Sequence, residues 1–152
     1  MKVKWAKKGA LLLFCQLLLM ALIIIAPKEL SVNKGFEIFG IFLIFCFLSI
    51  FIKAKFDLKE AFHPFPEPKE RAPFISSGIY AKVRHPMYLS FILGGLGTSC
   101  IKQSVYVITL SIFLILILNI KYRYEDELLR NRWNEAATYQ QLVPALFPKL
   151  GR

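Results

Sequence analysis

Apolar residues fall into four runs along the chain, at residues 9–26, 36–52, 86–101 and 104–120. Each run is close to the minimum of about 17 residues that an α-helix needs to cross a bilayer core of roughly 30 Å. Only short polar turns separate the first run from the second and the third from the fourth, which favours two helical hairpins. The pattern predicts an all-α integral membrane bundle with four transmembrane helices, formed by a single domain over residues 1–152.

A longer polar region, residues 53–85, separates the two hairpins. Its prolines at positions 64, 66, 68 and 73 are incompatible with a continuous helix and favour extended backbone. Phe62, Phe65 and Phe74 offer apolar contacts to a membrane interface. We expect a loop along the membrane surface, which serves either as a plain connector or as a wall or lid of a site.

An amphipathic C-terminal helix is expected over residues 121–141, where a spacing of 100° per residue places aromatic and small residues on one stripe. Glu125 and Asp126 fall within this stripe, whereas Glu127 faces away. The helix dipole or a nearby cation accounts for Glu127. These two explanations account less well for Glu125 and Asp126, because a carboxylate buried beside aromatic residues needs a cation or a hydrogen-bond donor as its partner. This favours a functional role for at least one of them.

Composition supports a membrane protein, because 56% of the residues are hydrophobic. The net charge of +10 comes from cations that flank the apolar runs, so we interpret them as topology signals and lipid-headgroup contacts, with no nucleic-acid partner. They cluster before the first run, in the 53–85 loop and after the fourth run. The positive-inside rule therefore places both termini and this loop on the cytoplasmic side of an inner membrane. The clustered cations are Lys2, Lys4, Lys7, Lys8, Lys53, Lys55, Lys59, Lys69, Arg71, Lys82, Arg84, Lys121, Arg123, Arg130 and Arg132.

Three other features are interpreted without a functional role in cleavage, disulfide or metal chemistry. The first apolar run is long for a signal peptide and lacks a small-residue cleavage pattern, so we expect a retained span. Cys15, Cys46 and Cys100 have no paired spacing and are interpreted as small buried hydrophobes. His63 and His85 have no second ligand at helical spacing, so no metal site is expected.

Residues 76–90, S-S-G-I-Y-A-K-V-R-H-P-M-Y-L-S, concentrate chemically active side chains before the third run. Pro86 suits the first position of a helix and so places His85 at its cap, where unpaired backbone N–H groups can hold polar ligand atoms. A histidine at a membrane boundary can instead donate to a carbonyl or a lipid headgroup. His85 is therefore a candidate ligand contact.

Three blocks of sequence go together: R-H-P-M-Y at residues 84–88, E-D-E-L-L at 125–129 and W-N-E-A-A-T-Y-Q-Q-L-V-P at 133–144. In combination they resemble the isoprenylcysteine carboxyl methyltransferase and phospholipid methyltransferase family of small integral-membrane enzymes. The resemblance covers residues 64–148, and the combination is specific although each block alone is weak. Asp126 stands where glutamate is usual, Asn134 where glycine is common, and Ala72 where a polar residue is often found.

The resemblance implies S-adenosylmethionine as cofactor, bound at the cytoplasmic face. By position, the residues that would hold it are Phe74, Ile75, Tyr80, His85, Pro86, Met87, Tyr88 and Glu125. Lys121, one helical turn before Glu125, would face the methyl acceptor. Tyrosine rings stabilise a cation such as the sulfonium by roughly 0.5–2 kcal/mol each, and a carboxylate accepts hydrogen bonds from ribose hydroxyls or the amino group.

Which side chains take part in methyl transfer depends on the head group of the methyl acceptor. Methyl transfer needs alignment more than acid–base help. If the acceptor is a carboxylate, Arg84 or Lys121 would orient it; if it is an amine, Asp126 is the candidate general base. A site bounded by membrane spans suits an amphiphile whose tail stays in lipid, such as a prenylated or lipid-like molecule, and both head groups remain open.

Two other functions remain open. A membrane reductase of the sterol-reductase type shares a short R-H-x-x-Y-like motif and uses NADPH, although this chain has no glycine-rich phosphate loop. A non-enzymatic membrane protein would use its charges for topology alone. Binding of one cofactor or the other separates these alternatives.

Overall fold

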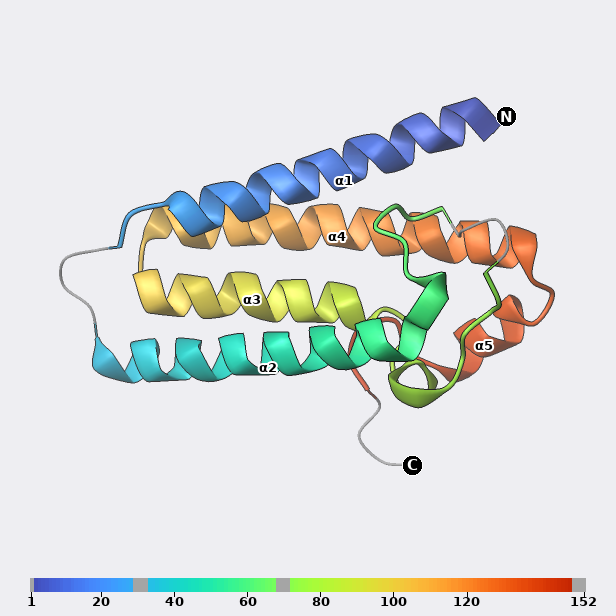
Figure 1. Cartoon of the computed structure of the whole chain (residues 1–152). Coiled ribbons are helices and arrows are strands. Elements are labelled where there is room, and N and C mark those ends of the chain that lie inside the picture. Colours follow the sequence, from blue (N-terminus) through green and yellow to red (C-terminus); the bar gives the residue numbers. More distant parts are fainter. Residues whose placement is uncertain (1, 29–32, 68–71, 149–152) are drawn as a thin grey trace.

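The computed structural model describes residues 2–28, 33–67 and 72–148, and within these ranges the chain forms helices and no strand. The elements are α1 (Lys2–Ile25), α2 (Lys34–Leu58), η1 (Lys59–Ala61), η2 (Gly78–Ala81), α3 (Pro86–Lys102), α4 (Val105–Arg132) and α5 (Ala136–Leu142). Figure 1 shows the four long helices in the order α1, α4, α3, α2, with α5 near one end. The predicted all-α class is confirmed for this part of the chain. Lys69 and Arg71, used above for orientation, lie outside the described residues.

Local sequence explains where the helices begin and end. α1 ends just before Pro27, whose ring and missing N–H do not continue a helix. The Asn33 side chain caps α2 by accepting a hydrogen bond from the Gly35 N–H at 2.8 Å. α3 begins at Pro86 and ends at Lys102, and the next residue, Gln103, adopts a left-handed conformation with φ of 47°.

The end of the fourth apolar run corrects one prediction. The helix expected over residues 121–141 is divided: its first part continues α4 as far as Arg132, and α5 is a separate helix from Ala136 to Leu142. α4 contains no glycine or proline, so nothing interrupts it where the apolar run gives way to polar residues. The residue after its end, Trp133, has an extended backbone. Glu125 and Asp126 therefore belong to a long extension of a candidate span.

Close packing between helices holds the bundle together. α2 lies against α3 so closely that a Cβ atom on Gly40 would come within 2.6 Å of the Gly97 carbonyl oxygen. The buried core lies between α1, α3 and α4 and contains Ile23, Ala26, Tyr88, Ile92, Val107, Leu110, Leu114 and Leu118. Tyr88 joins this core to the polar end of the bundle, because its ring is buried while its hydroxyl reaches α4.

Large apolar side chains cover the outside of the bundle, as expected for contact with lipid. Exposed fractions reach 75% at Ile25, 73% at Phe56 and 77% at Val105. Three helices in the described ranges are long and apolar enough to cross a membrane: Lys7–Ile25, Lys34–Ala61 and Val105–Arg132. α3 has 17 residues, which corresponds to roughly 26 Å at the usual rise and is slightly shorter than a typical bilayer core.

Candidate functional site

A glycine turn precedes α3 and is fixed by the end of α2. Gly78 has φ of 62°, and a Cβ atom there would collide with the carboxylate of Asp57. That carboxylate accepts a hydrogen bond from the Ile79 N–H at 2.7 Å. Both the positive φ and the close approach favour glycine at this position. The turn in consequence places Tyr80, which is buried, at the start of the site.

Asp126 forms a buried ionic network with the two residues before Pro86. Its Oδ2 accepts a hydrogen bond from Arg84 Nη2 at 2.8 Å, and its Oδ1 lies 2.9 Å from His85 Nε2. An ionised carboxylate can only accept, so the His85 Nε2 carries the hydrogen of this contact. Both oxygens of Asp126 are thereby engaged, which balances the cost of burying its charge.

The same two residues also bind the end of α5 and the segment that follows it. Arg84 Nη1 donates to the Gln140 carbonyl at 2.6 Å. The backbone N–H groups of Arg84 and His85 donate to the carbonyls of Pro144 and Ala145, each at 2.9 Å. The chain after α5 is therefore held directly beneath the start of α3, which closes that side of the site.

Glu125 lies on the other side of His85 and contacts Tyr88. The Tyr88 hydroxyl donates to Glu125 Oε2 at 2.6 Å, and His85 Nδ1 is 3.8 Å from the same oxygen. The rings of His85 and Tyr88 are stacked with centroids 5.5 Å apart. The Glu125 side chain keeps 28% of its surface exposed, so one carboxylate oxygen is left to meet a ligand.

Lys121 is buried to 1% exposure and is held by α1 and by the proline-rich loop. Its Nζ donates to Gln16 Oε1 at 2.6 Å and to the Pro64 carbonyl at 3.3 Å, and it lies 5.4 Å from the centre of the Tyr88 ring. An ammonium group has three donors, so one remains for another partner. The arrangement presents a fixed cation at the membrane end of the site.

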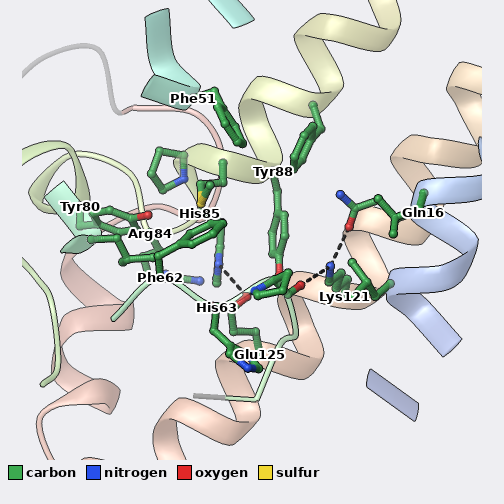
Figure 2. Close-up of a pocket in the computed structure, with 17 residues that line it drawn as sticks. Gln16, Phe51, Phe62, His63, Tyr80, Arg84, His85, Tyr88, Lys121 and Glu125 are labelled. Carbon is green, nitrogen blue, oxygen red and sulfur yellow. Dashed lines mark hydrogen bonds and ion pairs between the residues drawn. The ribbon is translucent and has the colours of Figure 1, made fainter. Parts of the chain in front are cut away.

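These side chains surround a cavity of about 170 Å³, the first cavity. Figure 2 shows Tyr80 and Arg84 on one side of it and Gln16 with Lys121 on the other. Towards the bundle interior the walls become apolar. There they consist of Leu13 and Leu17 from α1, Phe51 from α2 and Phe91 from α3.

A second cavity, of about 90 Å³, adjoins the first and shares Leu58, His63, Tyr80, Arg84 and Glu125 with it. Its remaining walls include four aromatic side chains, Phe65, Phe74, Trp133 and Tyr139. The Phe74 ring lies 5.5 Å from that of Trp133 and 5.3 Å from that of Tyr139, measured between centroids. The second cavity thus offers flat ring faces next to the shared wall, which carries Arg84 and Glu125.

Burial raises the pKa of both Tyr80 and Tyr139 above the usual value for tyrosine, and the negative charge of Glu125 adds to the effect at Tyr80. Both hydroxyls therefore stay protonated at neutral pH. The Tyr139 hydroxyl donates to the Tyr80 carbonyl at 2.6 Å, which fixes α5 against the glycine turn. The folded state keeps these protons while the unfolded chain loses them above about pH 10, so the two tyrosines lower stability at strongly alkaline pH.

Two buried polar atoms at the site have no hydrogen-bond partner among the described residues: Glu67 Oε1 and Arg84 Nε. Such atoms are rare in folded proteins and indicate a place for a ligand or water. Glu67 lies beside Gly9 of α1 and borders the second cavity, and Arg84 borders both cavities. One unpaired acceptor and one unpaired donor therefore lie beside the cavities.

The structure brings most of the predicted site residues together. The first cavity is bordered by Tyr80, Arg84, His85, Pro86, Met87, Tyr88, Lys121 and Glu125, and the second by Phe74, Ile75, Tyr80, Arg84 and Glu125. Asp126 is not among the described residues that line these two cavities. It borders a surface hollow together with Arg123 and Gln140. Of the two neighbouring acids, Glu125 faces the cavities and Asp126 stabilises the start of α3.

Other residues at the site did not stand out in the sequence. Gln16 from α1, His63 and Pro64 from the proline-rich loop, and Glu67 all contribute to the walls. Gln16 alone offered a signal, because it is an amide inside a long apolar run. In the described part of the chain, no group of three or more His, Cys, Asp or Glu side chains is arranged to hold a metal ion.

Comparison with known proteins supports the interpretation of these motifs. A family model described as phospholipid methyltransferase matches residues 36–136. The chain is 35% identical over 77 residues to the cobalt-zinc-cadmium resistance protein CzcN of Cupriavidus metallidurans, covering 50% of this chain and 36% of that protein. It is 31% identical over 86 residues to the nickel-cobalt-cadmium resistance protein NccN of Alcaligenes xylosoxydans xylosoxydans, covering 54% of this chain and 39% of that protein.

The matched region of the family model spans more than half of the chain and contains both the Arg84–Tyr88 block and the two acids of α4. The alignments with the two resistance proteins cover less than half of those proteins, so they describe a shared region. The chain therefore belongs to the phospholipid methyltransferase family, within the isoprenylcysteine carboxyl methyltransferase-like group.

Proposed function

We propose that this protein transfers a methyl group from S-adenosylmethionine to an amphiphilic, membrane-resident acceptor at the cytoplasmic end of the bundle. Family membership indicates methyltransferase activity, and the cofactor and acceptor are our extension of it. One observation carries the proposal. Two adjoining cavities share the wall formed by Tyr80, Arg84 and Glu125, and one of them is aromatic and polar while the other opens towards apolar helix faces.

The second cavity and the shared wall suit the cofactor. When bound, S-adenosylmethionine supplies an activated methyl group on a positively charged sulfur. The Phe74 and Trp133 rings offer faces for a purine, and the unpartnered Glu67 Oε1 and the free oxygen of Glu125 can accept hydrogen bonds from hydroxyl or amino groups. Tyr80 completes this wall and can stabilise a cation by roughly 0.5–2 kcal/mol.

The other predicted cofactor contacts lie around the start of α3. His85, Pro86 and Met87 border the first cavity, and Ile75 borders the second. We propose that His85 acts mainly by holding the Tyr88 ring, through stacking, and the Asp126 carboxylate in place. Pro86 sets the direction of α3 and so aims both Met87 and Tyr88 at the cavity.

Lys121 is the side chain we propose to orient the acceptor. It is buried at the border of the first cavity, and two of its three donors are already fixed by Gln16 and Pro64. Holding the acceptor in line with the methyl group can supply up to about 7–11 kcal/mol of the barrier reduction in favourable cases. An acceptor with a negatively charged oxygen matches this cation and needs no general base.

Arg84 and Asp126 are more suited to positioning than to contact with substrate. Both Asp126 oxygens and both terminal nitrogens of Arg84 are engaged within the protein. This arrangement leaves Asp126 a poor general base, which also favours an anionic acceptor over an amine. We propose that this pair maintains the geometry of the shared wall.

Binding of purified protein to S-adenosylmethionine and to NADPH, measured by calorimetry, tests the proposal. We expect heat of binding with S-adenosylmethionine and none with NADPH. Incubation of membranes with methyl-labelled cofactor should then move the label into the organic-solvent extract. Binding of NADPH alone would indicate the reductase, and binding of neither cofactor would indicate a non-enzymatic protein.

We further propose that all four long helices cross the membrane as one domain, with both termini in the cytoplasm. α3 lies beside α2, and the turn after α3 is tied to the start of α2. The Gln103 side chain accepts from the Asn33 N–H at 2.9 Å and donates to the Asn33 carbonyl at 2.8 Å. This contact supports a crossing by α3, because it brings the α3–α4 turn to the end of the bundle where α2 begins.

The topology can be tested with single cysteines in a variant that lacks Cys15, Cys46 and Cys100. A cysteine in place of Lys34 is expected to react with a membrane-impermeant maleimide added to intact cells. A cysteine in place of Glu135 should react only after the cells are opened. Reaction of the Glu135→Cys variant in intact cells would show that α3 does not cross or that the orientation is reversed.

A further inference from the structure

A third cavity, of about 190 Å³, lies deeper in the bundle and we call it the distal cavity. It is lined by Met20, Ile23 and Ile24 from α1, Ile44 and Phe47 from α2, Phe91, Gly94, Gly95 and Thr98 from α3, and Leu114 from α4. The Thr98 hydroxyl donates to the Gly94 carbonyl at 2.9 Å, so its polar group is satisfied within α3. The walls are therefore apolar.

The distal cavity continues the first cavity along the same three helices. On α1 the lining passes from Leu13, Gln16 and Leu17 to Met20, Ile23 and Ile24; on α2 from Phe51 to Phe47 and Ile44; on α3 from Tyr88 and Phe91 to Gly94, Gly95 and Thr98. Steps of three or four residues keep side chains on one face of a helix. The two cavities therefore follow one another along the same helix faces, and we call them together the groove, with Lys121 at the border of its first section.

Phe91 is the residue that both linings share, and it stands between the two sections. Its ring centroid lies 5.6 Å from that of Phe51 and 6.1 Å from that of Phe47, both on α2. Beyond this cluster the Phe47 ring packs closely against Gly94 of α3, where an added Cβ atom would come within 3.3 Å of the ring. One aromatic side chain therefore separates the head-group end of the groove from its apolar end.

We propose that the distal cavity binds the hydrocarbon tail of the methyl acceptor and that Phe91 sets the length of tail that is accepted. This inference rests on the proposed function, because it assigns the tail of the same acceptor whose head group lies at Lys121. A flexible chain fits the groove, since its walls are apolar along α1, α2 and α3. From Phe91 to Thr98 the groove follows α3 for roughly 10 Å at the usual rise per residue.

The test measures transfer of labelled methyl from S-adenosylmethionine to a series of saturated fatty acids of increasing chain length, with alkylamines of the same lengths as a second series. In Phe91→Ala the optimum is expected to move to longer chains. Each further methylene that reaches the distal cavity should raise kcat/KM roughly fourfold. Thr98→Phe in the Phe91→Ala background should cancel this gain, because it fills the far end of the groove.

Phe113→Ala is the matched control, because Phe113 is 52% exposed on α4 and lies outside the described linings of both cavities. It should leave the chain-length profile unchanged. A profile that is the same in the wild type and Phe91→Ala would overturn the inference while leaving the proposed function intact. The same holds if Phe113→Ala shifts the profile as much as Phe91→Ala.

A second measurement does not depend on turnover. A fatty acid with a photoreactive group near the end of its chain is bound to purified Phe91→Ala protein, and the cross-linked residues are mapped by mass spectrometry. Labels at Met20, Phe47 or Thr98 would support the inference, and labels confined to the outer faces of the helices would overturn it. If no acceptor in either series is methylated by the wild type, the function is wrong for these acceptors, and the cross-link still decides whether the cavity binds a tail.

Discussion

Replacing Arg84 with alanine is expected to lower the free energy of unfolding by about 3–5 kcal/mol, because it leaves the buried Asp126 carboxylate without one of its two side-chain partners. The side chains of Arg84 and Asp126 are each only 11% exposed, so water replaces little of the lost interaction. The change also removes the donor to the Gln140 carbonyl. Circular dichroism of the detergent-solubilised protein during denaturant unfolding measures the effect.

Arg130→Ala is the control for Arg84→Ala, since it removes the same charge from the exposed face of α4. It should change stability by less than about 0.5 kcal/mol. Arg84→Lys should recover only part of the loss, because an ammonium group does not reproduce the fork of a guanidinium. Equal destabilisation by Arg84→Ala and Arg130→Ala would contradict the buried network as described.

Replacing Glu125 with alanine is expected to weaken binding of S-adenosylmethionine by roughly tenfold to a hundredfold, the range for hydrogen bonds to a charged group. Glu125 borders both cavities and receives the Tyr88 hydroxyl at 2.6 Å. The alanine variant loses the acceptor for the cofactor and also releases the tyrosine ring. Calorimetric titration of the wild type and the variant gives the two dissociation constants.

Glu127→Ala provides the comparison for Glu125→Ala, because Glu127 is exposed and lies two residues further along α4. It should bind the cofactor as the wild type does. The affinity of Glu125→Gln for S-adenosylmethionine should lie between those of Glu125→Ala and Glu127→Ala. The amide oxygen still accepts a hydrogen bond from the Tyr88 hydroxyl but carries no charge. If Glu125→Ala binds S-adenosylmethionine with unchanged affinity while remaining folded, the cofactor does not lie at the shared wall.

The sequence predicted the main helices because each depends on local signals. Four apolar runs correspond to α1, α2, α3 and the first part of α4, and Pro86 begins α3 as expected. The end of α4 was placed wrongly because polarity changes near residue 121 while helix propensity does not. Hydrophobic periodicity indicates whether a helix lies in an apolar or a polar environment more reliably than it indicates the residue at which the helix ends.

The division of roles between Glu125 and Asp126 depends on partners that are distant in sequence. The two acids are consecutive residues of α4, and helical periodicity places both on the face that carries the aromatic and small residues. Arg84, 42 residues earlier, engages Asp126 and leaves Glu125 to the cavities. Gln16 likewise meets Lys121 across 105 residues. No local pattern encodes such pairs, so the sequence indicated the region of the site but not these partnerships.

The end of α5 and the segment after it are recognised through the carbonyl groups of Gln140, Pro144 and Ala145. Every amino acid carries such a group, so these acceptors tolerate many substitutions. They do not tolerate a change in spacing, because one inserted or deleted residue would move the acceptors out of register with Arg84 and His85. Evolutionary drift in residues 140–145 should therefore preserve the length of the segment more strictly than its composition.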